Sequence, residues 1–226
     1  RDEIQAKTGI SHWVEHMQFK GTQRFPPGAL DRSISRLGGT WNAFTFFDWT
    51  TYLETLPAAD FELALMLEAD RMKGSLFDPE EVESERTVII SERQGNENEP
   101  FFQLAEAVQM AAFQQHPYRN TVIGGMEDLH QISRDDLFQY YQKYYNPHNA
   151  VLALAGDFET APMIEKIRGY YENIPGGPAI QRSILEELPQ AEERRVTVQG
   201  PGEIWPTRTV PTTGAPINSA VFFTTR

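Results

Sequence analysis

Residues 11–22 read SHWVEHMQFKGT. This stretch has the pattern of a helix that Gly21 can end, so we predict a helix over residues 8–21. In this helix His12 and His16 are four residues apart, which places them on one face and about one turn from each other. Two imidazoles arranged in this way can bind a single Zn²⁺ ion.

Glu15 lies three residues after His12 and therefore projects near the same face of the predicted helix. A carboxylate beside a zinc-bound water can accept the proton of that water near neutral pH. The metal also needs a third protein ligand and an open position for the water. The competing interpretation is that both histidines lie on a solvated helix face and that Glu15 is an incidental charge.

The third ligand has to come from a distant part of the chain. The three other histidines lie in loops or near prolines without the spacing of a metal motif, so carboxylates are the available pool. The helix that we predict over residues 79–94 carries these candidates: Glu80, Glu81, Glu83, Glu85 and Glu92. Glu85 and Glu92 are seven residues apart and share a face. From spacing alone, a solvated acid near the helix end is the simpler interpretation of Glu92.

The remaining chain mixes helices and strands without regular alternation. Further helices are predicted over residues 29–37, 58–73, 101–115, 133–145 and 160–173. Residues 40–56 are rich in Thr and aromatic side chains and contain no Gly or Pro, which predicts one long strand or two joined strands. Residues 150–155 predict a buried strand, and residues 195–199 predict a short one. This pattern favours an α+β fold.

The composition is that of a folded, globular chain. Of 226 residues, 40% are hydrophobic and 23% are charged. No apolar run is long enough for a membrane span. The formal net charge of -12 argues against nucleic acid as a partner. The chain has no cysteine, which excludes disulfides, thiolate catalysis and cysteine-based metal sites.

The two ends of the sequence suggest that it is a piece of a longer protein. The chain begins at Arg1 and shows no signal-peptide pattern, so we expect that any targeting segment is not present. The compartment therefore stays open between the bacterial periplasm and the cytoplasm. Residues 201–226 carry four prolines and no clear period, which favours a linker or the start of a missing second half.

HWVEH followed by MQFKGT resembles the inverted zinc motif of the family of pitrilysin, insulin-degrading enzyme and mitochondrial processing peptidase. The resemblance continues, in order, through GGTWNAFTFFDWTTY at residues 38–52, HPYRNTVIGGMEDLHQIS at 116–133 and YYNPHNAVLALAGDF at 144–158. It implies an N-terminal-type peptidase domain over residues 1–200 that lacks its first strands. The implied fold is a mixed, largely antiparallel sheet with helices packed on one face.

The resemblance also implies roles for the residues of the motif. His12, His16 and Glu92 would bind one Zn²⁺ per domain, and Glu15 would be the general base. Glu85 matches an acid seven residues before the third ligand, which in that family supports the zinc site without binding the metal.

A second implied feature is an edge strand against which a substrate peptide lies. Backbone hydrogen bonds of such a strand give affinity that is largely independent of sequence. The matching residues are Asn42, Ala43, Phe44 and Thr45. Without the resemblance, this segment is an ordinary amphipathic strand. Trp13 and the pair Phe46-Phe47 depart from the usual residues of the family, which affects the expected substrate preference and not zinc binding.

The leading hypothesis is a zinc metalloendopeptidase that acts on peptides or small unfolded proteins. The implied partner is a second homologous half or a partner subunit that encloses the peptide, so the isolated fragment should be weakly active or inactive. The alternative is a catalytically silent, peptide-binding partner subunit. A purely structural zinc domain is disfavoured, because such sites are usually four-coordinate and rich in cysteine. The acidic run over residues 78–99 is either a solvated face or the wall of a negative chamber that attracts basic peptides.

Overall fold

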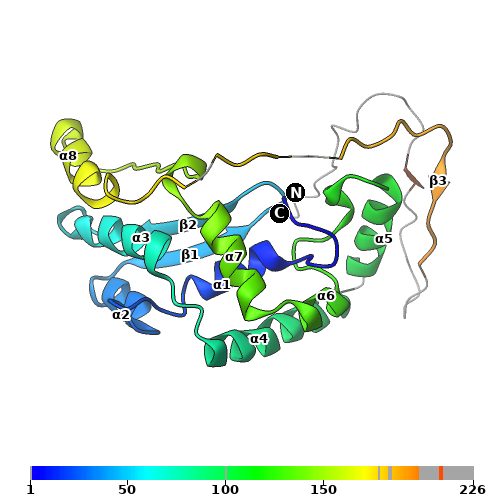
Figure 1. The fold of residues 1–226 in the computed structure, drawn as a ribbon, viewed down its shortest axis with the longest axis horizontal. Helices are drawn as coiled ribbons and strands as arrows, with labels where there is room; N and C mark the ends of the chain where they lie inside the picture. The colour runs from blue at the N-terminus through cyan, green and yellow to red at the C-terminus, as the bar shows by residue number, and fades with distance from the viewer. Residues whose placement is uncertain (1, 100, 178, 183–184, 199–208, 211–226) are drawn as a thin grey trace.

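The computed structural model describes residues 2–99, 101–177, 179–182, 185–198 and 209–210 (Figure 1). The helices are α1 (Ile10–Met17), α2 (Ala29–Arg36), α3 (Glu62–Gly74), α4 (Pro79–Glu97), α5 (Phe102–Ala112), α6 (Met126–Gln131), α7 (Arg134–Tyr144) and α8 (Thr160–Tyr171). The strands are β1 (Thr40–Thr45), β2 (Thr50–Thr55), β3 (Arg194–Arg195) and β4 (Thr209–Val210). None of the described helices combines the length and the apolar character that a membrane-crossing segment requires.

Residues 40–56 form two joined strands, the second of the two predicted options. β1 and β2 pair antiparallel, with Thr45 opposite Thr50 at the closed end of the hairpin. The Phe46 amide donates to the Trp49 carbonyl at 2.8 Å and closes the turn. β3 and β4 form a second antiparallel pair. The described part of the chain is therefore a mixed fold, mostly helical, with little sheet.

The strand predicted over residues 150–155 is wrong. This segment pairs with no described strand, and Val151 is 94% exposed. The run of apolar residues has the composition of a buried strand, but a strand also needs a neighbour that offers free backbone groups. The strand predicted over residues 195–199 is reduced to Arg194–Arg195. Gln199 and most of residues 201–226 lie outside the described residues.

Helix α1 is shorter than predicted and begins at Ile10, because Gly9 before it has a φ of 86°. That left-handed conformation favours glycine. A Cβ on Gly9 would also lie 2.4 Å from the carbonyl oxygen of Ile123. Thr8 secures the same junction, since its Oγ1 donates to Asp128 at 2.5 Å and accepts from the Gly125 amide at 2.9 Å. The start of α1 is thus held directly against residues 123–125.

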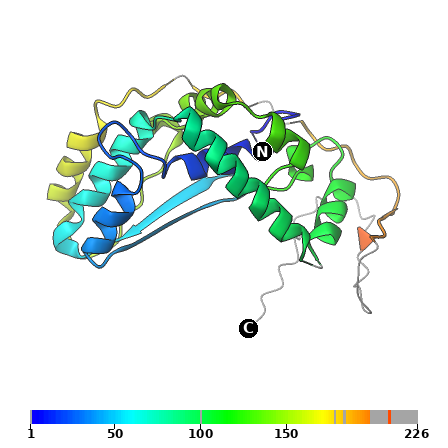
Figure 2. The ribbon, with the colours of Figure 1, turned by 90° about the horizontal axis from the view of Figure 1, so that it is seen from below.

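Helix α1 lies between the hairpin and α4, as Figure 2 shows. Eight residues are too few for a helix that is stable alone in water, so packing has to stabilise it. Its apolar face lies in the main core, which also takes in residues from α4, α6 and α7. The fully buried members of this core include Trp13, Val14, Met17, Phe77, Val82, Ile89, Leu129 and Leu137. The polar face of α1 remains for the site.

Trp13 tests this packing. Its ring is fully buried, and the Arg86 guanidinium lies 4.6 Å from the ring centre. We expect Trp13→Ala to lower the free energy of unfolding by about 3–5 kcal/mol, because it leaves a large core cavity. Trp49→Ala is the matched control, since Trp49 is 55% exposed at the hairpin turn. Urea denaturation measures both values, and equal losses for the two variants would contradict the assignment of Trp13 to the core.

Candidate metal centre

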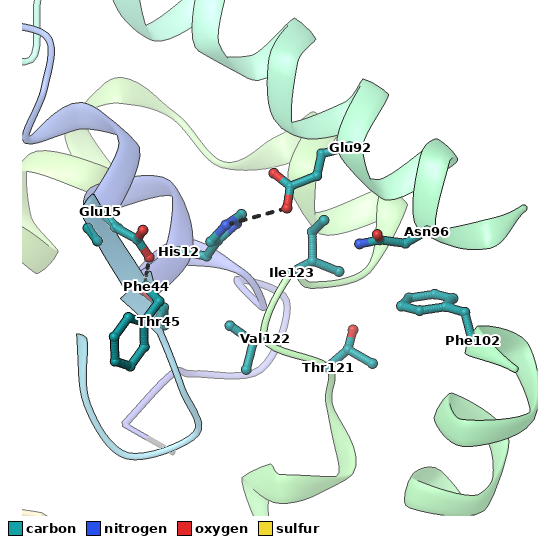
Figure 3. A pocket seen from close by; sticks show the side chains of 11 residues that line it. His12, Glu15, Phe44, Thr45, Glu92, Asn96, Phe102, Thr121, Val122 and Ile123 are labelled. Carbon is teal, nitrogen blue, oxygen red and sulfur yellow. Dashed lines mark hydrogen bonds and ion pairs between the residues drawn. The ribbon is translucent and has the colours of Figure 1, made fainter. Parts of the chain in front are cut away.

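His12, His16 and Glu92 come together between α1 and α4, although Glu92 is 76 residues after His16 in the chain. The two Nε2 atoms of the histidines are 3.2 Å apart. Glu92 Oε1 lies 3.8 Å from His12 Nε2, and Glu92 Oε2 lies 3.7 Å from His16 Nε2. One ligand atom from each of the three residues, on two helices, lies within 4.8 Å of the other two. Figure 3 shows His12 and Glu92 facing each other.

The donor set fits a zinc ion. Two imidazole nitrogens at about 2.0–2.1 Å from a tetrahedral zinc are separated by about 3.3 Å, close to the distance between the two histidines. The carboxylate oxygens are slightly farther away and would approach by a small rotation of the Glu92 side chain. Three protein donors leave a fourth position open, which is typical of catalytic zinc and not of structural zinc.

Glu85 lies behind the site and contacts a proposed ligand. Its Oε1 accepts from His16 Nδ1 at 2.8 Å, which leaves His16 Nε2 as the nitrogen that faces the centre. Its Oε2 forms an ion pair with Lys20. Burial by itself raises the pKa of the Glu85 carboxyl, but the hydrogen bond from His16 and the charge of Lys20 hold the pKa below its usual value. Glu85 therefore remains a carboxylate that orients His16.

Glu15 lines the pocket beside this cluster, and the residue is only 6% exposed. Thr45 Oγ1 donates to Glu15 Oε2 at 2.5 Å. Burial raises the pKa of Glu15, and the hydrogen bond from Thr45 partly offsets that rise. Burial likewise lowers the pKa of His12 to about 4, so the metal-free imidazole is neutral and can offer a lone pair.

The pocket beside these residues has a volume of about 420 Å³. One wall is β1, through Ala43, Phe44 and Thr45, and the opposite wall comes from α4, α5 and the segment before α6. Its remaining lining residues are His12, Glu15, Glu92, Asn96, Phe102, Thr121, Val122 and Ile123 (Figure 3). Asn42 is the one residue of the predicted edge strand that does not line this pocket. Its side chain accepts from the Ala43 amide at 2.9 Å instead.

Within the described residues, no strand pairs with β1 on the side away from β2. Phe46 and Trp49 form a hydrogen-bonded pair, and such pairs alternate along an antiparallel ladder. The amide and carbonyl groups of Ala43 and Thr45 therefore point away from β2, toward the open edge of the hairpin. An extended peptide can add to that edge.

Sequence reasoning missed Lys20 and the side chain of Thr45. Lys20 had a usable signal, since it lies four residues after His16 and so on the same face of the chain segment. Thr45 had no such signal, because its contact with Glu15 depends on how the hairpin lies on α1.

Trp13 does not line the pocket, so its bulk concerns the core and not the peptide. Of the other candidate acids on α4, Glu81 lies 3.8 Å from Lys20 and Glu83 is paired with Arg86.

Two imidazoles, a ligand carboxylate and a second carboxylate in one pocket are typical of metal-dependent hydrolases. The insulinase family, peptidase family M16, matches residues 1–125, and the family described as the M16 inactive domain matches residues 131–210. Because the first match covers more than half of the chain, this protein belongs to the insulinase (M16) family.

Individual relatives agree with this assignment. Zinc protease PqqE of Helicobacter pylori is 31% identical over 205 residues, which are 89% of this chain and 46% of that protein. Cytochrome b-c1 complex subunit 1 of Bos taurus is 29% identical over 176 residues, 78% of this chain and 37% of that protein. The crystal structure of a protease from Helicobacter pylori has a TM-score of 0.76 at 30% identity and covers 84% of this chain and 46% of that one. This chain thus spans less than half the length of these relatives.

The geometry predicts different roles for the two acids on α4. We expect Glu92→Gln to abolish stoichiometric metal binding, since it replaces a charged donor at the centre. Glu85→Gln should weaken zinc affinity about 10–100-fold without removing the site, because it changes only the orientation of His16. Competition with a chelator and metal analysis measure both. His16→Ala is the control for complete loss, and equal loss in the two α4 variants would contradict the distinction.

Proposed function

We propose that this protein is a zinc metalloendopeptidase that acts on peptides or small unfolded proteins. One observation carries the proposal: His12 and Glu92 of the donor cluster, with the buried Glu15, line the same pocket as Ala43, Phe44 and Thr45 of β1, and His16 completes the cluster behind them. Metal ligands, base and a binding strand for an extended chain are the parts that peptide hydrolysis needs. Membership of the insulinase family and the likeness to zinc protease PqqE support it.

His12, His16 and Glu92 would hold the zinc ion, and Glu85 with Lys20 behind it would orient His16. When bound, zinc lowers the pKa of a coordinated water and polarises the scissile carbonyl. Glu15 accepts the proton of the attacking water at its carboxylate and passes it to the leaving amine. The raised pKa of Glu15, caused by burial, suits a group that has to take up and release a proton near neutral pH.

The substrate would lie as an added strand along Asn42, Ala43, Phe44 and Thr45. The outward amide and carbonyl groups of Ala43 and Thr45 would bond to the peptide backbone. The Asn42 side chain now occupies the Ala43 amide and would have to release it. Because backbone groups carry this recognition, substrates of varied sequence are expected.

A second half or partner subunit would complete the enclosure of the peptide. This chain matches less than half of the length of its relatives, which supports such a partner. Within this arrangement, residues 1–200 would be the metal-bearing domain and residues 201–226 the connection to the other half.

A catalytically silent, peptide-binding subunit is the second candidate. The likeness to cytochrome b-c1 complex subunit 1, named as a subunit of a complex, favours it. The clustered His12, His16 and Glu92, with Glu15 beside them, favour the enzyme instead. A silent subunit would have no use for a buried carboxylate next to three metal donors.

Glu15→Gln separates these alternatives. In the complete protein, with its second half or partner, this variant should keep zinc and peptide affinity and lose hydrolysis by at least ~10²–10⁴-fold. Zinc content, peptide affinity and turnover are measured on the same preparations of wild type and variant. Turnover that survives the change would refute Glu15 as the base, and loss of zinc would make it a ligand.

Ala43→Pro tests the edge strand. Proline removes the outward amide of Ala43 but no bond of the hairpin ladder, and edge positions of this kind tolerate it. We expect KM for peptides to rise about 3–10-fold through the loss of one backbone hydrogen bond, with zinc content unchanged. Ala43→Ser keeps the amide and is the control. An unchanged KM in the proline variant would exclude pairing at this position.

A further inference from the structure

The side chain of Thr45 points to the proposed base and not to the open edge where a peptide would pair. Its Oγ1 donates to Glu15 Oε2 at 2.5 Å, and Oε1 makes no hydrogen bond within the described residues. The two carboxylate oxygens therefore differ: one is held by the hairpin, and the other is left for the pocket. Thr45 is also the last residue of β1, so its backbone belongs to the proposed peptide-binding edge.

The Thr45 hydroxyl also contacts a second hydroxyl group on the neighbouring strand β2. Its Oγ1 lies 2.9 Å from Thr50 Oγ1, directly across the hairpin. Tyr145 directly follows α7, and its Oη lies 2.8 Å from Tyr52 Oη. The Tyr52 ring in turn lies 4.3 Å from the buried guanidinium of Arg71.

The Glu15 carboxylate sets the direction of both hydrogen bonds of the Thr45 hydroxyl. An ionised carboxylate only accepts, so Thr45 has to donate its single proton to Glu15. The Thr45 oxygen can then only accept, which makes Thr50 the donor in the next bond. Burial raises the pKa of Tyr52 and of Tyr145, that of Tyr145 to about 12, so this pair keeps its protons.

We propose that Thr45 is a positioning residue, which fixes the Glu15 carboxylate so that one oxygen faces the metal pocket while the other is anchored to the peptide-binding hairpin. The inference rests on the proposed function, because it assigns Glu15 the task of a base. It places the base and the edge strand in one rigid unit. A peptide that pairs with β1 then lies at a constant distance from the Glu15 carboxylate.

Two substitutions at Thr45 test the hydroxyl separately from the shape. Thr45→Val keeps the volume and the strand preference but removes the donor. In the complete protein we expect kcat to fall about 10-fold or more, the scale of a hydrogen bond to a charged group, with KM changed less than about 2-fold. Thr45→Ser restores the donor and should recover most of kcat. Zinc content and peptide affinity, measured without turnover, should be equal in all variants.

Thr40→Val is the matched control, because Thr40 lies exposed at the other end of the same strand. A second readout does not depend on activity. In the metal-free protein, Thr45→Val should destabilise the fold, and this loss should shrink in a Glu15→Ala background, because the two residues act as a pair.

The outcomes separate the inference from the function on which it rests. Wild-type protein without zinc-dependent hydrolysis would refute the proposed function, and the assignment of Thr45 to a base would fall with it. Active wild type with an unchanged kcat in Thr45→Val would overturn the inference alone. A loss confined to KM or zinc content would also overturn it, since Thr45 would then serve binding. A fall in kcat that Thr45→Ser reverses would support it.

Discussion

Helix α1 has to satisfy two demands with only eight residues. One face carries Trp13, Val14 and Met17 into the main core, and the opposite face presents His12 and His16. Because so short a helix is not stable alone, the metal donors are in place only while the apolar face stays packed. The close approach of Gly9 to residues 123–125 fixes where the helix begins and brings the far wall of the pocket to the histidines. The site therefore depends on core packing before it depends on any charge.

Two carboxylates of the site are equally buried and yet differ in chemistry. Glu85 is 5% exposed and lies between His16 and Lys20; burial raises its pKa, but the hydrogen bond from His16 and the charge of Lys20 outweigh this and lower the pKa. Glu15 has a neutral hydroxyl as its partner, and burial raises its pKa. When the surroundings shift the pKa values of two acids in opposite directions, one acid stays a fixed charge and the other can take up and release a proton. The difference comes from the neighbours and not from the residue type.

The β1–β2 hairpin connects the proposed peptide-binding edge with the proposed base. Its outer edge offers the backbone of Ala43 and Thr45, while its inner face places the Thr45 hydroxyl on Glu15. Across the hairpin, Thr50 contacts the Thr45 hydroxyl, and Tyr52 connects β2 with Tyr145 and Arg71. An open edge at the rim of a pocket that holds three metal donors is consistent with a chain that receives extended peptides. Membership of the insulinase family agrees with that arrangement.

Local spacing was enough to place His12 and His16 on one helix face and to predict the start of α4 at Pro79. Local composition predicted strand structure around Asn42 and left open whether it is one strand or two, because each of these features depends on neighbours a few residues away. Spacing alone left Glu92 as a plain helix-end acid, and only resemblance singled it out. The tertiary structure decided that Glu92 faces α1, that residues 150–155 pair with no strand among the described residues and that Thr45 reaches Glu15. Each of these depends on how separate elements pack, since a distance between residues far apart in the chain has no signature in local sequence.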